Sequence, residues 1–305
     1  MNNKLLAYIA FACTCIFWGT TFLALSFGLE SFPPLFVSGS RQAISGILIL
    51  VFFILSKEKF PSKSELKNIL ISGFIIVFLS NSLITWSLQY VPTGITGILF
   101  TLVPLFVVLI NIFIVRNEKI NLWLLLGILL GFGGCFLIFN LNNNSQSKIF
   151  GIIGIVAGVM SWAVGTIISQ KATLSVKPLL VAGLQLFIFG LFTSCISLFT
   201  EDLESLNNMK SESIFAVIYL IIFDSIVGYG CYLYALSKLS SSFVSLYAYI
   251  SPAIALFLGW IFKDEELSVK IIFGVVIIFS GVIFVNRGLI VNKENINSKN
   301  LVKKL

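Results

Sequence analysis

The chain has 305 residues, of which 58% are hydrophobic and only 11% are charged, and its formal net charge is +7. A typical soluble domain is about 25% charged, and a disordered chain lacks such an apolar content, so the composition excludes both classes. It indicates an integral membrane protein, in which a positive net charge reports loops beside anionic lipid and not a nucleic-acid partner.

Apolar segments of about 20 residues, the length that a helix needs to cross a bilayer, follow one another along the whole chain. In chain order they cover residues 5–27, 33–55, 69–89, 93–115, 121–139, 149–170, 178–199, 214–236, 242–262 and 269–286. The loops between them are short. We therefore expect ten transmembrane helices and no soluble domain between them.

The second half of the chain repeats landmarks of the first half. The following residues recur 144 or 148 positions later: Trp18 as Trp162, Pro34 as Pro178, Gly39 as Gly183, Pro104 as Pro252 and Glu118 as Glu266. Each copy holds five segments, an odd number, so the second copy is inverted in the membrane if every segment crosses it. The predicted fold is all-α, with one five-helix repeat at 1–143, a second at 148–290, and a basic cytoplasmic tail at 291–305.

Lysine and arginine side chains predict the orientation of the spans. With a cytoplasmic N-terminus, the basic residues that gather on the cytoplasmic side are Lys4, Lys57, Lys59, Lys63, Lys67, Arg116, Lys119, Lys171, Lys177, Lys238 and those of the tail. The opposite side holds only Lys148, Lys210 and Lys263. This bias places both termini in the cytoplasm.

Several local patterns resemble the EamA-type branch of the drug/metabolite transporter superfamily. They are Phe17-Trp18-Gly19-Thr20, Pro34 with Arg41, Pro104 and Glu118 in the first copy, and Ser161-Trp162, Pro178, Ala235-Leu236, Pro252 and Glu266 in the second. The resemblance covers residues 5 to 287. It implies an exporter or importer of small metabolites, often amino acids or related compounds, in a bacterial cytoplasmic membrane.

Two charged residues lie well inside the predicted spans, where a charge costs about 2.5–3.5 kcal/mol or more. Arg41 lies about 12 Å deep in the second span at 1.5 Å per residue, and Asp224 lies near the middle of the eighth. Arg41 suits a substrate carboxylate, whereas Asp224 suits a substrate amine or a coupling proton. The alternative is that the two pair with each other and only hold the bundle together.

Aromatic and amide side chains at similar depth are candidates for the wall of a solute cavity. With the two charged residues, the predicted substrate-binding set includes Trp18, Asn81, Trp86, Trp162, Tyr229, Tyr232 and Tyr249. Pro104 and Pro252 fall within matching spans and each removes a backbone donor, so they are predicted hinges or static kinks.

The main hypothesis is a secondary active transporter that exports an amino acid or related organic acid by alternating access. Its expected partners are a small-molecule solute and membrane lipids, with protons as the candidate coupling ion; the oligomeric state stays open. There is no histidine, no metal-binding cysteine pattern and no P-loop, so we expect no metal, no cofactor and no direct use of ATP. A membrane-embedded lipid or acyl transferase and a passive channel are the alternatives.

Overall fold

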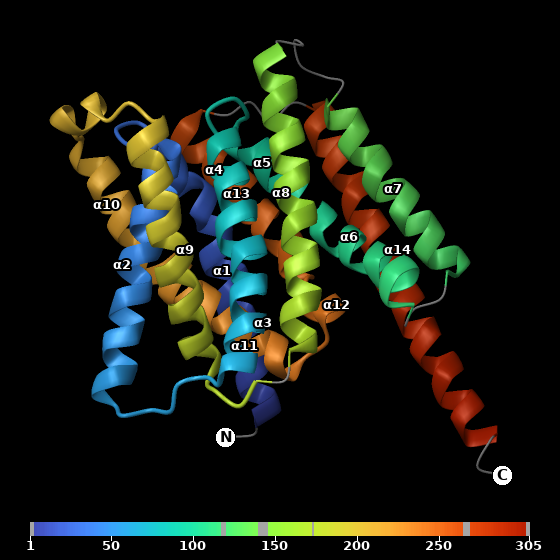
Figure 1. The fold of residues 1–305 in the computed structure, drawn as a ribbon. Coiled ribbons are helices and arrows are strands. Elements are labelled where there is room, and N and C mark those ends of the chain that lie inside the picture. The colour runs from blue at the N-terminus through green and yellow to red at the C-terminus, as the bar shows by residue number, and fades with distance from the viewer. Residues whose placement is uncertain (1–2, 117–119, 140–145, 173, 265–268, 303–305) are drawn as a thin grey trace.

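The chain folds into a bundle of helices in a computed structural model that describes residues 3–116, 120–139, 146–172, 174–264 and 269–302 (Figure 1). These residues include no β-strand. The elements of the first half are α1 (Asn3–Gly28), α2 (Pro34–Leu55), α3 (Lys63–Gly73), η1 (Phe74–Ser80), α4 (Asn81–Ser87), α5 (Thr93–Phe100), α6 (Leu102–Ile110), η2 (Asn111–Val115) and α7 (Leu122–Phe139). Those of the second half are α8 (Gln146–Lys171), α9 (Pro178–Thr200), η3 (Glu204–Asn208), α10 (Ser211–Tyr219), η4 (Leu220–Gly228), α11 (Tyr229–Lys238), α12 (Ser241–Val244), α13 (Tyr247–Lys263) and α14 (Val269–Val302).

Eight helical stretches of the described residues are long and apolar enough to cross a membrane. They are Lys4–Gly28, Pro34–Leu55, Lys63–Ser87, Thr93–Val115, Ile149–Lys171, Pro178–Thr200, Ser211–Lys238 and Ile272–Asn292. The fifth predicted span contains the shorter apolar helix Leu122–Gly134, and the ninth overlaps the shorter apolar helix Ile250–Lys263. The all-helical membrane class is confirmed, whereas the count of ten spans stays a prediction. Glu118 and Glu266 lie outside the described residues.

The third and eighth predicted spans each contain a π-helical segment. In the first half η1 ends at Ser80, and in the second half η4 ends at Gly228, which is the same repeat position. A π-helix inserts an extra residue into a turn, and this re-aims the side chains that follow. In the second half the segment holds Asp224, so this distortion helps to direct that carboxylate into the bundle.

The helices α2 and α9 lie in backbone contact with each other. A Cβ atom added to Gly46 would collide with the backbone of Phe187, and one added to Gly190 would collide with the backbone of Ala43. The two helices run antiparallel, because the Glu201 carboxylate after α9 accepts hydrogen bonds from the first backbone N–H groups of α2. Small residues allow this approach, since no hydrophobic effect drives helices together in lipid.

A second close pair, α7 and α14, stands at the side of the bundle (Figure 1). A Cβ atom on Gly127 would lie 2.6 Å from the carbonyl oxygen of Gly281, so glycine is needed on α7 at this position. At the end of the pair, Asn121 Nδ2 donates to the carbonyl oxygen of Gly288 over 2.8 Å. This pair also runs antiparallel, as repeat-related helices of an inverted duplication would.

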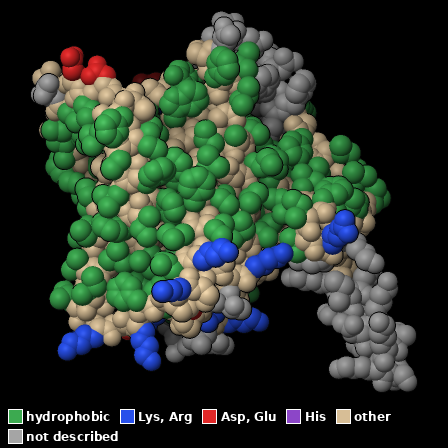
Figure 2. All heavy atoms as spheres, in the orientation of Figure 1, with side chains coloured by type: hydrophobic (Ala, Val, Ile, Leu, Met, Phe, Trp, Pro, Cys, Tyr) green, Lys and Arg blue, Asp and Glu red, His purple; other side chains and the backbone are tan. Residues whose placement is uncertain are grey.

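The outer surface matches a lipid environment. Apolar side chains cover the visible flank of the bundle, whereas lysine and arginine gather at the lower end, where α1 begins (Figure 2). Acidic side chains appear at the opposite end of the same view. The charge asymmetry expected from the loops is therefore present among the described residues.

Candidate functional site

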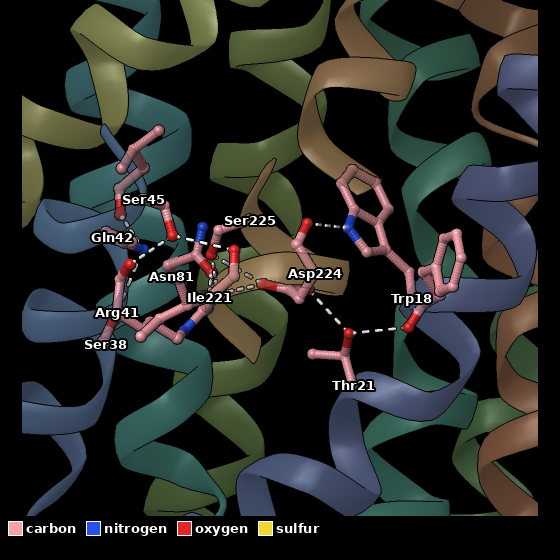
Figure 3. A network of polar contacts seen from close by, with 12 residues as sticks. Trp18, Thr21, Ser38, Arg41, Gln42, Ser45, Asn81, Ile221, Asp224 and Ser225 are labelled. Atoms are coloured by element: carbon pink, nitrogen blue, oxygen red, sulfur yellow. Dashed lines mark hydrogen bonds and ion pairs between the residues drawn. The ribbon is translucent and has the colours of Figure 1, made fainter. Parts of the chain in front are cut away.

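A buried ion pair joins the two charges that the sequence placed inside the membrane. Arg41 on α2 and Asp224 in η4 point toward each other, and Arg41 Nη1 donates to Asp224 Oδ2 (Figure 3). Their side chains are only 3% and 10% exposed. No other charged residue among those described is buried. The pairing that the sequence left open is therefore present in this conformation.

Neutral polar groups from three elements complete the surroundings of the pair. Arg41 donates from Nη1 to Ser225 Oγ over 2.9 Å and from Nη2 to Asn81 Oδ1 over 3.1 Å. Asp224 Oδ1 accepts from Thr21 Oγ1 over 2.7 Å. Buried charges are tolerated when further hydrogen bonds satisfy them, so this shell supports the pair at membrane depth.

Aromatic rings form a wall beside the ion pair. The Trp18 ring lies 5.2 Å from that of Trp162, 5.1 Å from that of Tyr232 and 4.7 Å from that of Tyr247, measured between centroids. The two tryptophans, which are related by the repeat, meet edge to face at 88°. Trp18 Nε1 donates to the backbone carbonyl oxygen of Asp224 over 3.3 Å and so connects the wall to the charged centre.

Two small cavities lie in this region, with volumes of about 30 and 50 Å³. The residues that line both are Trp18, Arg41, Asn81, Trp162 and Asp224. Such volumes hold a few water molecules and fall well below the roughly 300 Å³ at which ordinary ligand pockets begin. The centre of the bundle is therefore closed in this conformation.

Four buried polar atoms around the larger cavity have no hydrogen-bond partner among the described residues. They are Arg41 Nε, Thr85 Oγ1, Trp162 Nε1 and Tyr247 OH, and all four residues line this cavity. More than nine in ten buried polar groups in proteins are satisfied, so a group of unsatisfied ones needs an explanation. Two of the four are donors only, so the arrangement suits a ligand with acceptor oxygens such as a carboxylate.

The remaining predicted aromatic residues lie in different places. Tyr229 lines the smaller cavity and donates its hydroxyl to Gln185 Oε1 over 2.6 Å. Trp86 lies outside the central cluster, where its ring packs 5.0 Å from that of Tyr90. The side chain of Tyr249 lies outside what the structure describes.

Both predicted hinge prolines lie close to helix interruptions. Pro104 is the third residue of α6, which is separated from α5 by Thr101. Pro252 lies inside the continuous helix α13, and the interruption falls earlier, between α12 and α13. Next to this proline, Ser251 lines the larger cavity and donates to the carbonyl oxygen of Cys15 over 3.1 Å.

A wide vestibule lies on each side of the closed centre. The lysine-side vestibule has a volume of about 720 Å³ and is lined by residues that include Ser72, Lys177 and Lys238. The glutamate-side vestibule has a volume of about 650 Å³ and is lined by residues that include Glu30 and Glu201, together with Trp86. Neither vestibule shares a lining residue with the two central cavities, so the centre is separated from both in this conformation.

An ion-pair cluster lies at the edge of the glutamate-side vestibule. Glu30 accepts from Lys210 Nζ over 2.9 Å and from Lys263 Nζ. These two interactions, chiefly the hydrogen bond from Lys210, lower the pKa of the Glu30 carboxyl below its ordinary value of 4.5. The same contact raises the pKa of Lys210. The cluster joins the end of α1 to the segments that begin α10 and end α13.

Several residues of the site were missed from the sequence. Thr21 lies three residues after Trp18 and therefore on the same helix face, and this spacing was a usable signal. Ser225 and Tyr247 gave no comparable signal, because neutral polar side chains and tyrosines are common in membrane helices.

A bundle of membrane-length helices with a buried polar centre and a vestibule at each end defines a membrane transporter of small solutes. The chain belongs to the EamA-like transporter family, whose pattern matches residues 5–140 and 149–287. The resemblance inferred from the local motifs is therefore confirmed.

Two bacterial relatives agree with this assignment. The chain is 32% identical over 256 residues to the inner membrane transporter YedA of Escherichia coli, and this match covers 83% of this chain and 81% of that protein. It is 27% identical over 278 residues to the transporter YoaV of Bacillus subtilis, covering 89% and 93% of the two chains. A solved crystal structure superposes with a TM-score of 0.68 at 16% identity, over 93% of this chain and 97% of the other, and so shares its fold.

Proposed function

We propose that the chain is a secondary active transporter that exports an amino acid or a related organic acid by alternating access. The observation that carries the proposal is the buried Arg41–Asp224 pair beside a cavity with unpartnered polar atoms. A buried ion pair adds little net stability to a fold, since apolar residues of similar size often stabilise it equally well.

The proposed topology is ten spans in two inverted repeats, with both termini in the cytoplasm. The antiparallel pairs α2–α9 and α7–α14 support the inversion, and the lysine-rich end of the bundle supports the orientation (Figure 2). On this topology the lysine-side vestibule faces the cytoplasm. Pro104 and Pro252 are proposed hinges, because each lies close to a helix interruption.

In the proposed binding step, the carboxylate of the solute replaces the Asp224 carboxylate on the Arg41 guanidinium. Trp162 Nε1 and Tyr247 OH supply further hydrogen bonds, and the rings of Trp18 and Tyr232 contact the apolar part of the solute. Asp224, released from Arg41, binds the ammonium group of an amino acid. For a solute that has no ammonium group, protons are the proposed coupling ion.

The experiment that tests the proposal is counterflow in proteoliposomes with a panel of amino acids and organic acids. Wild type is compared with Arg41→Ala and with Arg116→Ala, a matched arginine at the end of η2 and outside the buried site. We expect saturable exchange of a carboxylate-bearing solute that is lost in Arg41→Ala and kept in Arg116→Ala. Exchange kept in a well-folded Arg41→Ala variant would contradict the assigned role of this residue, and non-saturable flux would indicate a channel.

A further inference from the structure

A chain of three hydrogen-bonded side chains separates the closed centre from the lysine-side vestibule. Tyr229, which lines the smaller cavity, donates to Gln185 Oε1 over 2.6 Å. Gln185 Nε2 in turn donates to Ser72 Oγ over 2.8 Å and to the carbonyl oxygen of Ile69 over 3.0 Å. Ser72 lines the vestibule. The link therefore runs from one compartment to the other.

The link is tightly packed as well as hydrogen-bonded. Gln185 is 0%, Ser72 is 2% and Tyr229 is 4% exposed, and the three side chains come from α9, α3 and α11. At Gly73 the backbone of α3 approaches so closely that an added Cβ atom would lie 2.8 Å from Gln185 Cγ. Passage between the two compartments by this route therefore requires that these helices separate.

The internal repeat relates this link to the charged centre. Gln185 and Tyr229 follow Arg41 and Asn81 by 144 and 148 positions, the two offsets of the repeat. Arg41 is hydrogen-bonded to Asn81 over 3.1 Å, and Gln185 is hydrogen-bonded to Tyr229 over 2.6 Å. The same pair of positions is thus in contact in both halves, once with a charge and once without.

The barrier toward the other vestibule has a different chemistry. Leu25 lines the larger cavity and packs in an apolar cluster with Phe32, Val37 and Leu220. Phe32 also lines the glutamate-side vestibule. A hydrogen-bonded barrier can be opened by any group that offers replacement bonds, whereas an apolar barrier has no bonds to replace.

We propose that the Tyr229–Gln185–Ser72 link is the lysine-side gate of the transport path, with Gln185 as its specificity-determining residue. The proposal rests on the proposed function, since a gate requires a path. The Gln185 amide uses both its oxygen and its nitrogen in the closed link, so a solute with acceptor and donor groups, such as an amino acid, replaces both bonds as it passes. An apolar solute replaces neither.

The test measures access to the centre and needs no transported solute. Thr85→Cys, in the larger cavity, is the reporter in a background in which the native cysteines are replaced. A charged, membrane-impermeant thiol reagent is applied to sealed vesicles from either side. The reporter is combined with Gln185→Ala, with Tyr229→Phe and with the control Thr193→Val, a buried α9 residue whose hydroxyl bonds only its own helix.

We expect labelling from the lysine side to be at least tenfold faster in Gln185→Ala than in the reporter alone. Loss of one neutral hydrogen bond changes such an equilibrium roughly fivefold, which is the expected effect of Tyr229→Phe. Labelling in Thr193→Val, and labelling of every variant from the opposite side, should not change. If Gln185→Ala does not fold, the rate of lysine-side labelling in Tyr229→Phe alone tests the gate.

Equal rates in all variants, or faster labelling from both sides, would overturn the gate. Its failure is distinguishable from failure of the proposed function. If wild type exchanges no solute while labelling depends on Gln185, the transport proposal fails, and the link controls access to the centre without being a transport gate. If exchange is found while labelling ignores Gln185, only the gate fails.

Discussion

The Arg41–Asp224 pair allows a prediction that separates stability from transport. Asp224→Leu leaves the guanidinium of Arg41, 3% exposed, with only the neutral partners Asn81 and Ser225. Removing one partner of a buried pair costs about 3–5 kcal/mol, so each of Asp224→Leu and Arg41→Met should lose that much unfolding free energy. The double variant has no unpaired buried charge, and we expect it to recover to within about 1–2 kcal/mol of wild type.

The assay is unfolding by SDS titration in mixed micelles, followed by counterflow with the same preparations. The double variant should be folded and inactive, because Arg41 is the only buried cationic side chain among the described residues. Full counterflow in the double variant would refute the role of the pair in solute binding. Losses below about 1 kcal/mol in both single variants would refute the premise that the pair is desolvated.

Three further predictions address other parts of the chain. Trp162→Phe removes an unpartnered indole N–H and should weaken solute binding about tenfold in counterflow without loss of stability. Trp18→Phe removes an indole N–H that is hydrogen-bonded and should lower the unfolding free energy by about 1 kcal/mol in the SDS titration. Equal losses of stability in the two variants would contradict this prediction. Because the folded pKa of Glu30 is lowered, its stabilising contribution is present above its ordinary value of 4.5 and is lost as the pH falls through the folded pKa; Glu30→Gln should therefore lower the thermal midpoint at pH 7 and have no effect in strong acid, and a difference that persists there would argue against the cluster. Gly127→Leu should separate α7 from α14, because an added Cβ atom would lie 2.6 Å from the carbonyl oxygen of Gly281; an unchanged SDS titration would show that this contact does not hold the pair.

Hydropathy predicted the helices well but not their interruptions. The span predicted at 33–55 is observed as the helix Pro34–Leu55, because a long apolar run between polar loops is a strong signal. The span predicted at 242–262 is interrupted at Ser245 and Leu246, ahead of Pro252, where the sequence shows no breaker. The π-helical segments were also not predicted, since apolar composition is the same in π- and α-helices.

The candidate site was predicted where a residue carried an obvious physical cost or recurred in the repeat. Arg41 and Asp224 stood out because a charge in a membrane is expensive, and the structure brings them together. Trp18 and Trp162 stood out through their equivalent positions, and their rings are in contact. Gln185 occupies the repeat position of Arg41 without its charge, and nothing local in the sequence reveals its link to Tyr229.

The glycine contacts between α2 and α9 limit how the bundle can move. With Gly46 and Gly190 each against the backbone of the other helix, the two helices have no layer of side chains that could slide or repack between them. We therefore expect α2 and α9 to move as one unit, which carries Arg41 on α2 and Gln185 on α9. A motion that carries a solute across then moves the other helices relative to this pair, while the distance between Arg41 and Gln185 stays constant.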